Sequence, residues 1–303
     1  MALIHTLVLA LVLPLSAEAP RVSVRAEDGL ADQTARAAAI AGPALARIEA
    51  DLAGLRVPQV EVRLVKHAED IAAAAPAGRG APTWASGTAY PDEGVVVVAL
   101  RGRDGALLDW ERTLAHELAH VALGRALGGR EPRWLTEGFA NLHSSDESLT
   151  RATTLFGAMV AGKIRPLWEI EETFPAEEAE AGLAYAESYD FVAWLAWRGR
   201  WSDDRDDGDR EPFRRFLAEL AAGNDLDAAG LAAYGRRLVD LEAEWLGSLR
   251  ARYLWVPLSF FGGLVWVLAS LLLVIGWLRR RAAKRSTLRR WEIEEAEEDA
   301  RDE

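Results

Sequence analysis

The sequence predicts an α+β domain, made of a small β-sheet and many helices, followed by a single C-terminal transmembrane helix. Three observations support this class. Segments with strand patterns lie early in the chain, helical segments dominate the rest of the domain, and a long uncharged stretch lies near the C-terminus. Half of the 303 residues are hydrophobic and 27% are charged, which excludes a disordered or collagen-like chain.

The composition also excludes several classes of site and partner. The chain has no cysteine, so disulfides, thiolate metal sites, a cysteine nucleophile and a lipid-modified cysteine are ruled out. Lys and Arg number 35 against 47 Asp and Glu, which gives a formal net charge of −12. This balance argues against nucleic acid as a partner.

Residues 1–19 are predicted to be a signal peptide. The apolar run from Ala2 to Leu15 is too short to span a bilayer. The sequence Ala17-Glu18-Ala19 after it has the small-x-small form of a cleavage site. No Lys or Arg precedes the run and Pro20 would follow the cut, so an uncleaved anchor is the alternative.

Residues 254–278 are predicted to be a transmembrane helix, because the stretch is uncharged and exceeds the roughly 20 residues that a span needs. Trp255 and Trp277 lie near its ends, where indole rings favour the headgroup layer. Seven Lys or Arg residues follow between residues 279 and 290, and they place the basic-then-acidic tail 279–303 in the cytoplasm by the positive-inside rule.

Residues 20–252 are therefore expected to form a domain outside the cytoplasm. The composition, rich in alanine and arginine, indicates a bacterial chain. We expect a single-pass protein of the bacterial cytoplasmic membrane, with this domain on the periplasmic or extracellular side and oligomeric state left open.

The first part of the domain shows both helix and strand patterns. Residues 30–52 predict a helix that is interrupted at Gly42-Pro43. Apolar and polar residues alternate over 57–65, which predicts a half-buried strand. The other elements expected here are a short helix at 67–75, a short strand near 83–89 and a buried strand at 95–100.

The second part is helical. Asp109 is a suitable N-cap for a helix over 110–127, which Gly128-Gly129 ends. The next helix starts after Pro132 and runs to about His143. Further helices are expected at 149–161, 183–198, 212–222 and 236–252.

The chemistry lies in this first helix pair, which contains the motif His-Glu-x-x-His. On a helix, His116 and His120 lie one turn apart on one face, so both imidazoles can bind one tetrahedral zinc ion. Glu117 follows the first ligand and can face a metal-bound water instead of the metal. Glu137, on the next helix, is the candidate third ligand, and Gly138 allows a close approach of that helix.

The segment from Thr113 to Asn141 resembles the gluzincin metallopeptidases, and most closely the peptidase-MA-like group, which is similar to aminopeptidase N and distantly to thermolysin. The metzincin pattern does not fit, because Leu123 and Ala126 stand where its Gly and His would be. The resemblance covers about residues 57–200.

The resemblance implies zinc ligands at His116, His120 and Glu137, with a general base at Glu117. It also implies that an edge strand ahead of the zinc helix holds the substrate backbone, and residues 95–100 are the candidate for that strand or its neighbour.

Aminopeptidases of this type carry an oxyanion-stabilising tyrosine before an apolar helix, and Tyr185 takes that place here. Tyr189, one turn later, is the alternate, and either tyrosine could instead be a core residue. Asn141 could orient a ligand or lie at the surface. His143, six residues past Glu137, could line the cleft, but an exposed position at the helix end is favoured.

We therefore expect a membrane-anchored zinc metallopeptidase that acts on peptide or protein substrates. The chain lacks the Gly-x-Met-Glu-Asn amine anchor of aminopeptidases, which favours an endopeptidase. An intramembrane protease is disfavoured because polar residues flank the motif and the apolar span begins far downstream. The alternative is a catalytically inactive metal- or peptide-binding module of the same fold.

Overall fold

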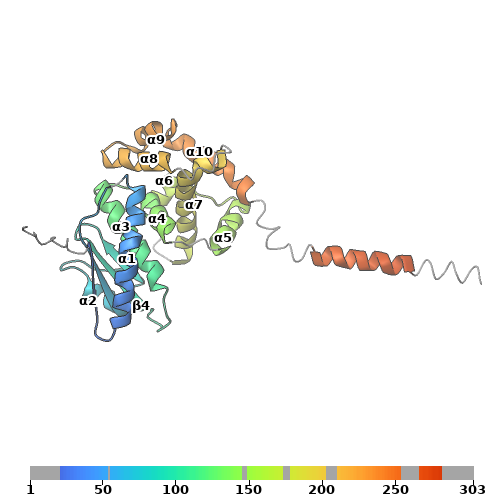
Figure 1. Ribbon diagram of the computed structural model, residues 1–303. Coiled ribbons are helices and arrows are strands. Elements are labelled where there is room, and N and C mark those ends of the chain that lie inside the picture. The colour runs from blue at the N-terminus through green and yellow to red at the C-terminus, as the bar shows by residue number, and fades with distance from the viewer. Residues whose placement is uncertain are drawn as a thin grey trace, which may run out of the picture. The chain divides into compact units, whose positions relative to one another are not determined.

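The computed structural model describes residues 21–53, 55–144, 149–172, 178–202, 210–253 and 266–281 (Figure 1). The predicted signal peptide at 1–19, residues 254–265 of the predicted membrane span, and residues 282–303 of the predicted tail lie outside the described residues. The chain divides into two compact units. The first comprises Met1–Glu147 and Arg165–Ala243, and the second comprises Ser148–Ile164 and Glu244–Glu303.

The first unit contains a four-stranded sheet. Its strands are β1 (Val22–Ala26), β2 (Val60–His67), β3 (Gly87–Tyr90) and β4 (Val95–Arg101). The spatial order is β1-β2-β4-β3, so β4 is internal and β3 is an edge strand. The strands β1, β2 and β4 are parallel, whereas β3 runs antiparallel to β4. The prediction of a small sheet with helices is confirmed, and β1 is a strand that the sequence analysis missed.

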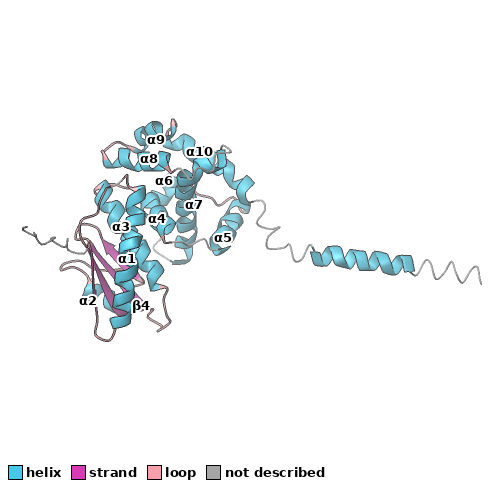
Figure 2. Ribbon diagram, in the orientation of Figure 1, coloured by secondary structure: helices cyan, strands magenta, loops and turns pink. Residues whose placement is uncertain are grey.

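In the chain, α1 lies between β1 and β2, η1 and α2 lie between β2 and β3, and the remaining helices follow β4 (Figure 2). In the first unit they are α1 (Ala31–Asp51), η1 (Ala68–Asp70), α2 (Ile71–Ala74), α3 (Trp110–Leu127), α4 (Arg133–His143), α6 (Leu167–Glu172), α7 (Glu178–Ser202), α8 (Glu211–Ala221) and α9 (Leu226–Tyr234). The second unit contains α5 (Leu149–Val160), and α10 (Leu238–Tyr253) begins in the first unit and ends in the second. Of these helices, α6 and α9 were not expected.

Both faces of the sheet are covered, which explains why β4 is apolar at nearly every position. On one face, Val95, Val97 and Ala99 form a buried cluster with Tyr90 and Ile71. The helices α1 and α3 pack on the sheet, α1 against β1 and α3 against β3 and β4. A strand that is buried on both sides reads as a continuous hydrophobic run, as residues 95–100 do.

Helix α1 is continuous through Pro43, so the expected interruption is wrong. A proline within a helix costs roughly 3 kcal/mol because it lacks an N–H and its ring crowds the preceding turn. Residues on both sides of it are buried, among them Ala37, Ala41, Leu45 and Ile48. Burying a single large aliphatic side chain contributes roughly 1.5–3 kcal/mol, so this packing offsets the proline.

The ends of α3 are set by local signals, as predicted. The carboxylate of Asp109 accepts a hydrogen bond from the backbone N–H of Arg112 (3.3 Å). Gly128 ends the helix with a left-handed backbone, at φ 69°. The short connection that follows allows α4 to return against α3.

Helix α4 also packs closely on α7, and Gly138 permits this approach. A Cβ atom at Gly138 would lie 2.4 Å from the carbonyl oxygen of Ser188 and 2.5 Å from Cγ2 of Val192. Gly138 was expected to allow a close approach of its helix, and the structure shows that α4 makes this approach to α7.

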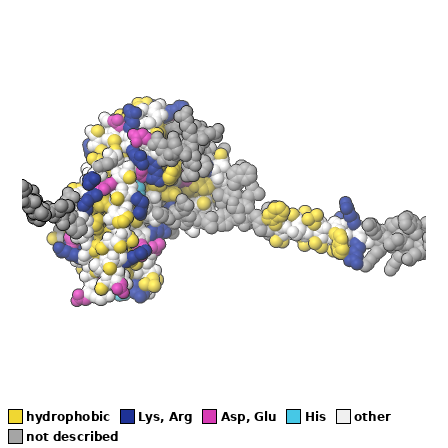
Figure 3. Space-filling model, viewed as in Figure 1, with side chains coloured by type: hydrophobic (Ala, Val, Ile, Leu, Met, Phe, Trp, Pro, Cys, Tyr) yellow, Lys and Arg dark blue, Asp and Glu magenta, His cyan; other side chains and the backbone are white. Residues whose placement is uncertain are grey.

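In the part of the chain that the structure describes, no helix is long and apolar enough to cross a membrane. Residues 266–281, which cover part of the predicted span, form a helix. Its apolar side chains are exposed, among them Trp266, Leu272 and Leu273 (Figure 3). Arg281 at its end lies over the ring of Trp277.

Candidate metal centre

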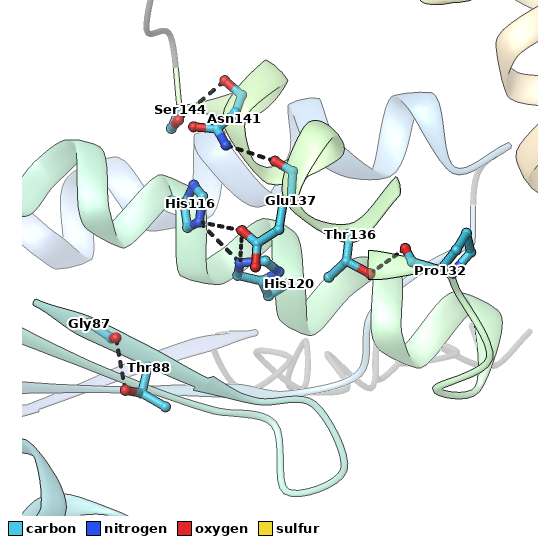
Figure 4. A network of polar contacts seen from close by, with 9 residues as sticks. All are labelled: Gly87, Thr88, His116, His120, Pro132, Thr136, Glu137, Asn141 and Ser144. Carbon is cyan, nitrogen blue, oxygen red and sulfur yellow. Dashed lines mark hydrogen bonds and ion pairs between the residues drawn. The ribbon is translucent and has the colours of Figure 1, made fainter. Parts of the chain in front are cut away.

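Three side chains from α3 and α4 converge on one point (Figure 4). The Nε2 atoms of His116 and His120 lie 3.0 Å apart. Each of them lies 3.7 Å from Oε2 of Glu137. The two histidines are on one face of α3 because they are four residues apart, and Glu137 is brought in by α4.

The donor set fits a tetrahedral zinc ion. With zinc–ligand bonds of about 2.0–2.1 Å, tetrahedral geometry separates ligand atoms by roughly 3.3 Å. The observed separations of 3.0, 3.7 and 3.7 Å bracket that value. Two imidazoles and a carboxylate are also the ligand set of several catalytic zinc sites.

Burial and mutual charge keep two of these groups ready to bind a cation. Burial, together with the charge of His116, lowers the pKa of His120 to about 4. Burial would raise the pKa of the Glu137 carboxyl, but the hydrogen bond from His116 and the charges of both histidines outweigh it and lower that pKa. His120 is therefore neutral and Glu137 ionised at neutral pH.

His116 differs from His120. Burial lowers the pKa of its imidazole, but the hydrogen bond to Glu137 and the negative charges of Glu117 and Glu137 outweigh burial and raise it. As the pH falls, His116 is therefore the first of the three ligands to take up a proton. A metal ion must displace that proton in order to bind.

Glu117 lies on α3 next to His116, but its carboxyl group faces the sheet. The residue is buried, and burial raises the pKa of its carboxyl group to about 7. The backbone N–H of Ala89, on β3, donates a hydrogen bond to this carboxyl and opposes the increase. A carboxyl group with a pKa near neutrality is suited to take up and release a proton at physiological pH.

Tyr185 lies on α7, near the two carboxyl groups of the centre. Burial, followed by the charges of Glu137 and Glu117, raises the pKa of its phenol to about 12. The hydroxyl therefore stays protonated and is able to donate a hydrogen bond. Tyr189, the alternate, lies one turn further along α7 and is half-buried.

Asn141 is buried, and its side-chain N–H donates to the backbone carbonyl of Glu137 (2.9 Å). It therefore supports the backbone of α4 and does not contact the ligand carboxylate through this bond. At the other end of α4, Glu171 accepts a hydrogen bond from the backbone N–H of Arg133 (2.5 Å). The Glu171 contact joins the start of α4 to α6, whereas the Asn141 bond lies within α4.

His143 is not an exposed residue at a helix end, so that expectation is wrong. Its side chain is only 8% exposed, and Nε2 lies 3.4 Å from Oδ2 of the buried Asp51. Its ring lies 4.5 Å from that of Phe139. Asp51 also pairs with Arg210. The residues around His143 in the sequence did not indicate this contact, because Asp51 is far away in the chain.

Strand β3 contributes residues that the sequence analysis did not single out. Gly87 and Ala89 lie on this strand, and both are beside Glu117 of α3. The edge strand next to the centre is β3, the neighbour of β4. The one signal available in the sequence was a glycine within a strand pattern, which often marks a close approach of another group.

Comparison with known families places most of the chain in one of them. The family described as the peptidase MA superfamily matches residues 40–251, which include every candidate ligand as well as Glu117 and Tyr185. No curated protein matches the chain. The match confirms the resemblance that the His-Glu-x-x-His segment suggested.

Zinc affinity should fall as the pH falls, because the raised pKa of His116 makes a proton compete with the metal ion. Below that pKa, we expect the apparent affinity to drop about tenfold for each pH unit. Competition with a chromogenic chelator between about pH 8 and about pH 5 measures this slope.

The variant His116→Ala should lose tight zinc binding at every pH, whereas the control His67→Ala should titrate like the wild type. An affinity that stays constant over this pH range would contradict the assignment of His116.

Proposed function

The chain belongs to the peptidase MA superfamily, and on this basis we propose that it is a zinc-dependent metallopeptidase that hydrolyses peptide bonds. The observation that carries the proposal is a separation of roles within α3. His116 and His120 point with Glu137 to one shared point, whereas Glu117, between them in the sequence, points to β3. A centre that only stored a metal ion would not need this fourth, buried carboxyl group.

In this proposal His116, His120 and Glu137 would hold zinc, which would supply Lewis acidity and make water at the centre easier to deprotonate. Glu117 accepts a proton from the attacking water while the new carbon–oxygen bond forms. It then donates that proton to the leaving nitrogen as the carbon–nitrogen bond breaks. A carboxyl pKa of about 7 suits both halves of this transfer.

Tyr185 is the proposed oxyanion donor. Its hydroxyl stays protonated, since its pKa is raised to about 12, and it lies within electrostatic reach of Glu137 and Glu117. A hydrogen bond from such a donor stabilises negative charge on the carbonyl oxygen as it develops.

The proposed substrate is an extended peptide, cleaved within its length. The strand beside Glu117 has the sequence Gly87-Thr88-Ala89-Tyr90, which contains no acidic side chain to bind a free amino terminus. An edge strand can instead bind a peptide backbone by adding it to the sheet. These two features favour endopeptidase activity.

We also propose that the chain is anchored to the bacterial cytoplasmic membrane by residues 254–278, with the peptidase domain outside and residues 279–303 inside. The support is the uncharged stretch followed by seven cations, together with the exposed apolar side chains of the helix at 266–281. Reporter fusions test this arrangement. A reporter that works only outside the cytoplasm should be inactive after Arg290, and activity there would contradict the orientation.

Replacing Glu117 with glutamine should separate catalysis from metal binding. Glutamine keeps the shape of the side chain but cannot accept the proton of water. Zinc content and thermal stability should stay close to those of the wild type, while turnover of a cleaved peptide should fall by about 10²- to 10⁴-fold.

The matched variant Glu137→Gln should instead weaken zinc binding, because a neutral amide is a poorer ligand than a carboxylate. Zinc analysis and a peptide-library digest of the same preparations provide the measurements. Loss of zinc in Glu117→Gln with retention in Glu137→Gln would show that the ligands are wrongly assigned. A wild type that holds zinc and cleaves no peptide would favour the binding-module alternative.

Tyr185→Phe should lower kcat by about 10²- to 10³-fold, the usual loss for one oxyanion donor, and leave zinc content unchanged. Tyr189→Phe removes a hydroxyl from the same helix one turn away and is the matched control. Steady-state kinetics on one peptide compare the two. A larger loss in Tyr189→Phe would transfer the oxyanion role to that residue.

A further inference from the structure

One edge of β3 is not paired with β4, and Glu117 lies beside this strand. The carbonyl oxygen of Ser86 accepts a hydrogen bond from the backbone N–H of Ala99 on β4 (3.0 Å). In an antiparallel ladder such pairs alternate, so the N–H and C=O groups of Gly87 and Ala89 point away from β4. Helix α3 packs on one face of β3, and the Ala89 N–H donates to the carboxyl of Glu117.

Gly87 lies where a side chain would collide with α3. A Cβ atom at this position would be 2.5 Å from Cγ2 of Thr113, 3.0 Å from Cγ of Glu117 and 3.1 Å from Oε1 of Glu117. Thr113 and Glu117 are one turn apart on α3, so both face the strand. Figure 4 shows the strand that carries Gly87 and Thr88 beside the helix that carries His116 and His120.

We propose that Gly87 is a positioning residue for Glu117: the absence of a side chain lets the carboxyl lie against β3 and accept the Ala89 N–H. This inference rests on the proposed role of Glu117 as the general base. A glycine within a strand is less stable than alanine would be, and a required close approach gives a reason to keep it.

Two different contacts constrain Gly87, and they lead to different consequences. The contact with Thr113 Cγ2 concerns only the packing of α3 on β3. The contacts with Cγ and Oε1 of Glu117 concern where the carboxyl group lies. A methyl group at Gly87 would require the carboxyl group to shift by a few tenths of an ångström from its position beside the Ala89 N–H, while the ligands His116 and His120 stay in place.

The two contacts can be separated with the variants Gly87→Ala, Thr113→Ser and the double variant. Serine removes Cγ2 but keeps the hydroxyl, which donates to the carbonyl oxygen of Asp109 (3.1 Å). The double variant therefore removes the collision with Cγ2 and leaves the two tight contacts with Glu117. Thr113→Ser alone should behave like the wild type.

The double variant should match the wild type in zinc content and melting temperature. Its kcat should fall by roughly tenfold or more with KM unchanged, since the carboxyl group no longer reaches the reacting water. Amide hydrogen exchange provides a measurement that does not depend on activity. Ala89 should exchange at least about tenfold faster than in the wild type, as it should in Glu117→Ala, while Thr88, which is paired with β4, stays protected.

Recovery of both kcat and Ala89 protection in the double variant would overturn the proposal, because Gly87 would then serve only packing against Thr113. The exchange result stands even if the wild type cleaves no peptide. In that case the proposed function fails. Fast exchange at Ala89 in the double variant would still support the positioning of Glu117 by Gly87, and unchanged exchange would still overturn this positioning role.

Discussion

The position of α4 is the constraint on which the candidate metal centre depends. Glu137 reaches the two histidines only because α4 lies between α3 and α7, and Gly138 lets α4 approach α7 at backbone distance. Contacts with other segments hold both ends of the helix. Glu171 accepts a hydrogen bond from its first N–H, and at its last residue Nε2 of His143 lies 3.4 Å from Oδ2 of the buried Asp51. The close packing of α4 therefore fixes the position of the Glu137 carboxylate beside the two histidines.

The electrostatics of the centre follow from burying several titratable groups together. An isolated buried charge is costly, so each group settles in the protonation state that its neighbours favour. Burial raises the pKa of Glu117, while the histidines lower that of Glu137, although both are carboxyl groups in one site. Two carboxyl groups with pKa values shifted in opposite directions are typical of an acid–base residue beside a permanently ionised one.

The helix α7 links the packing of α4 to the proposed oxyanion donor. Tyr185 lies on it, and three residues further Ser188 provides the carbonyl against which Gly138 packs. Between them, the fully buried Glu187 accepts hydrogen bonds from the backbone N–H (2.8 Å) and guanidinium of Arg165. Removing one partner of such a buried pair is usually strongly destabilising, so this pair holds α7 firmly to the segment that precedes α6.

The local features of this protein are determined by the sequence itself. Helix periodicity puts His116 and His120 on one face, and Asp109 and Gly128 set the ends of α3, since all of these act within a few residues. The helix α4 and the strands β2 and β4 are also predictable from the sequence, because their hydrophobic patterns are strong. Short or weakly patterned elements, such as β1, were missed.

Only the tertiary structure decided which distant residues meet. It extended α1 through Pro43, buried His143 against Asp51, assigned the close contact of Gly138 to α7 and placed Gly87 and Ala89 beside Glu117. Each of these contacts joins segments that are well separated in the chain or depends on burial by such segments. A local sequence pattern does not identify the distant segment that it will contact. The energy of burial and close packing arises only when the folded chain brings the two surfaces together.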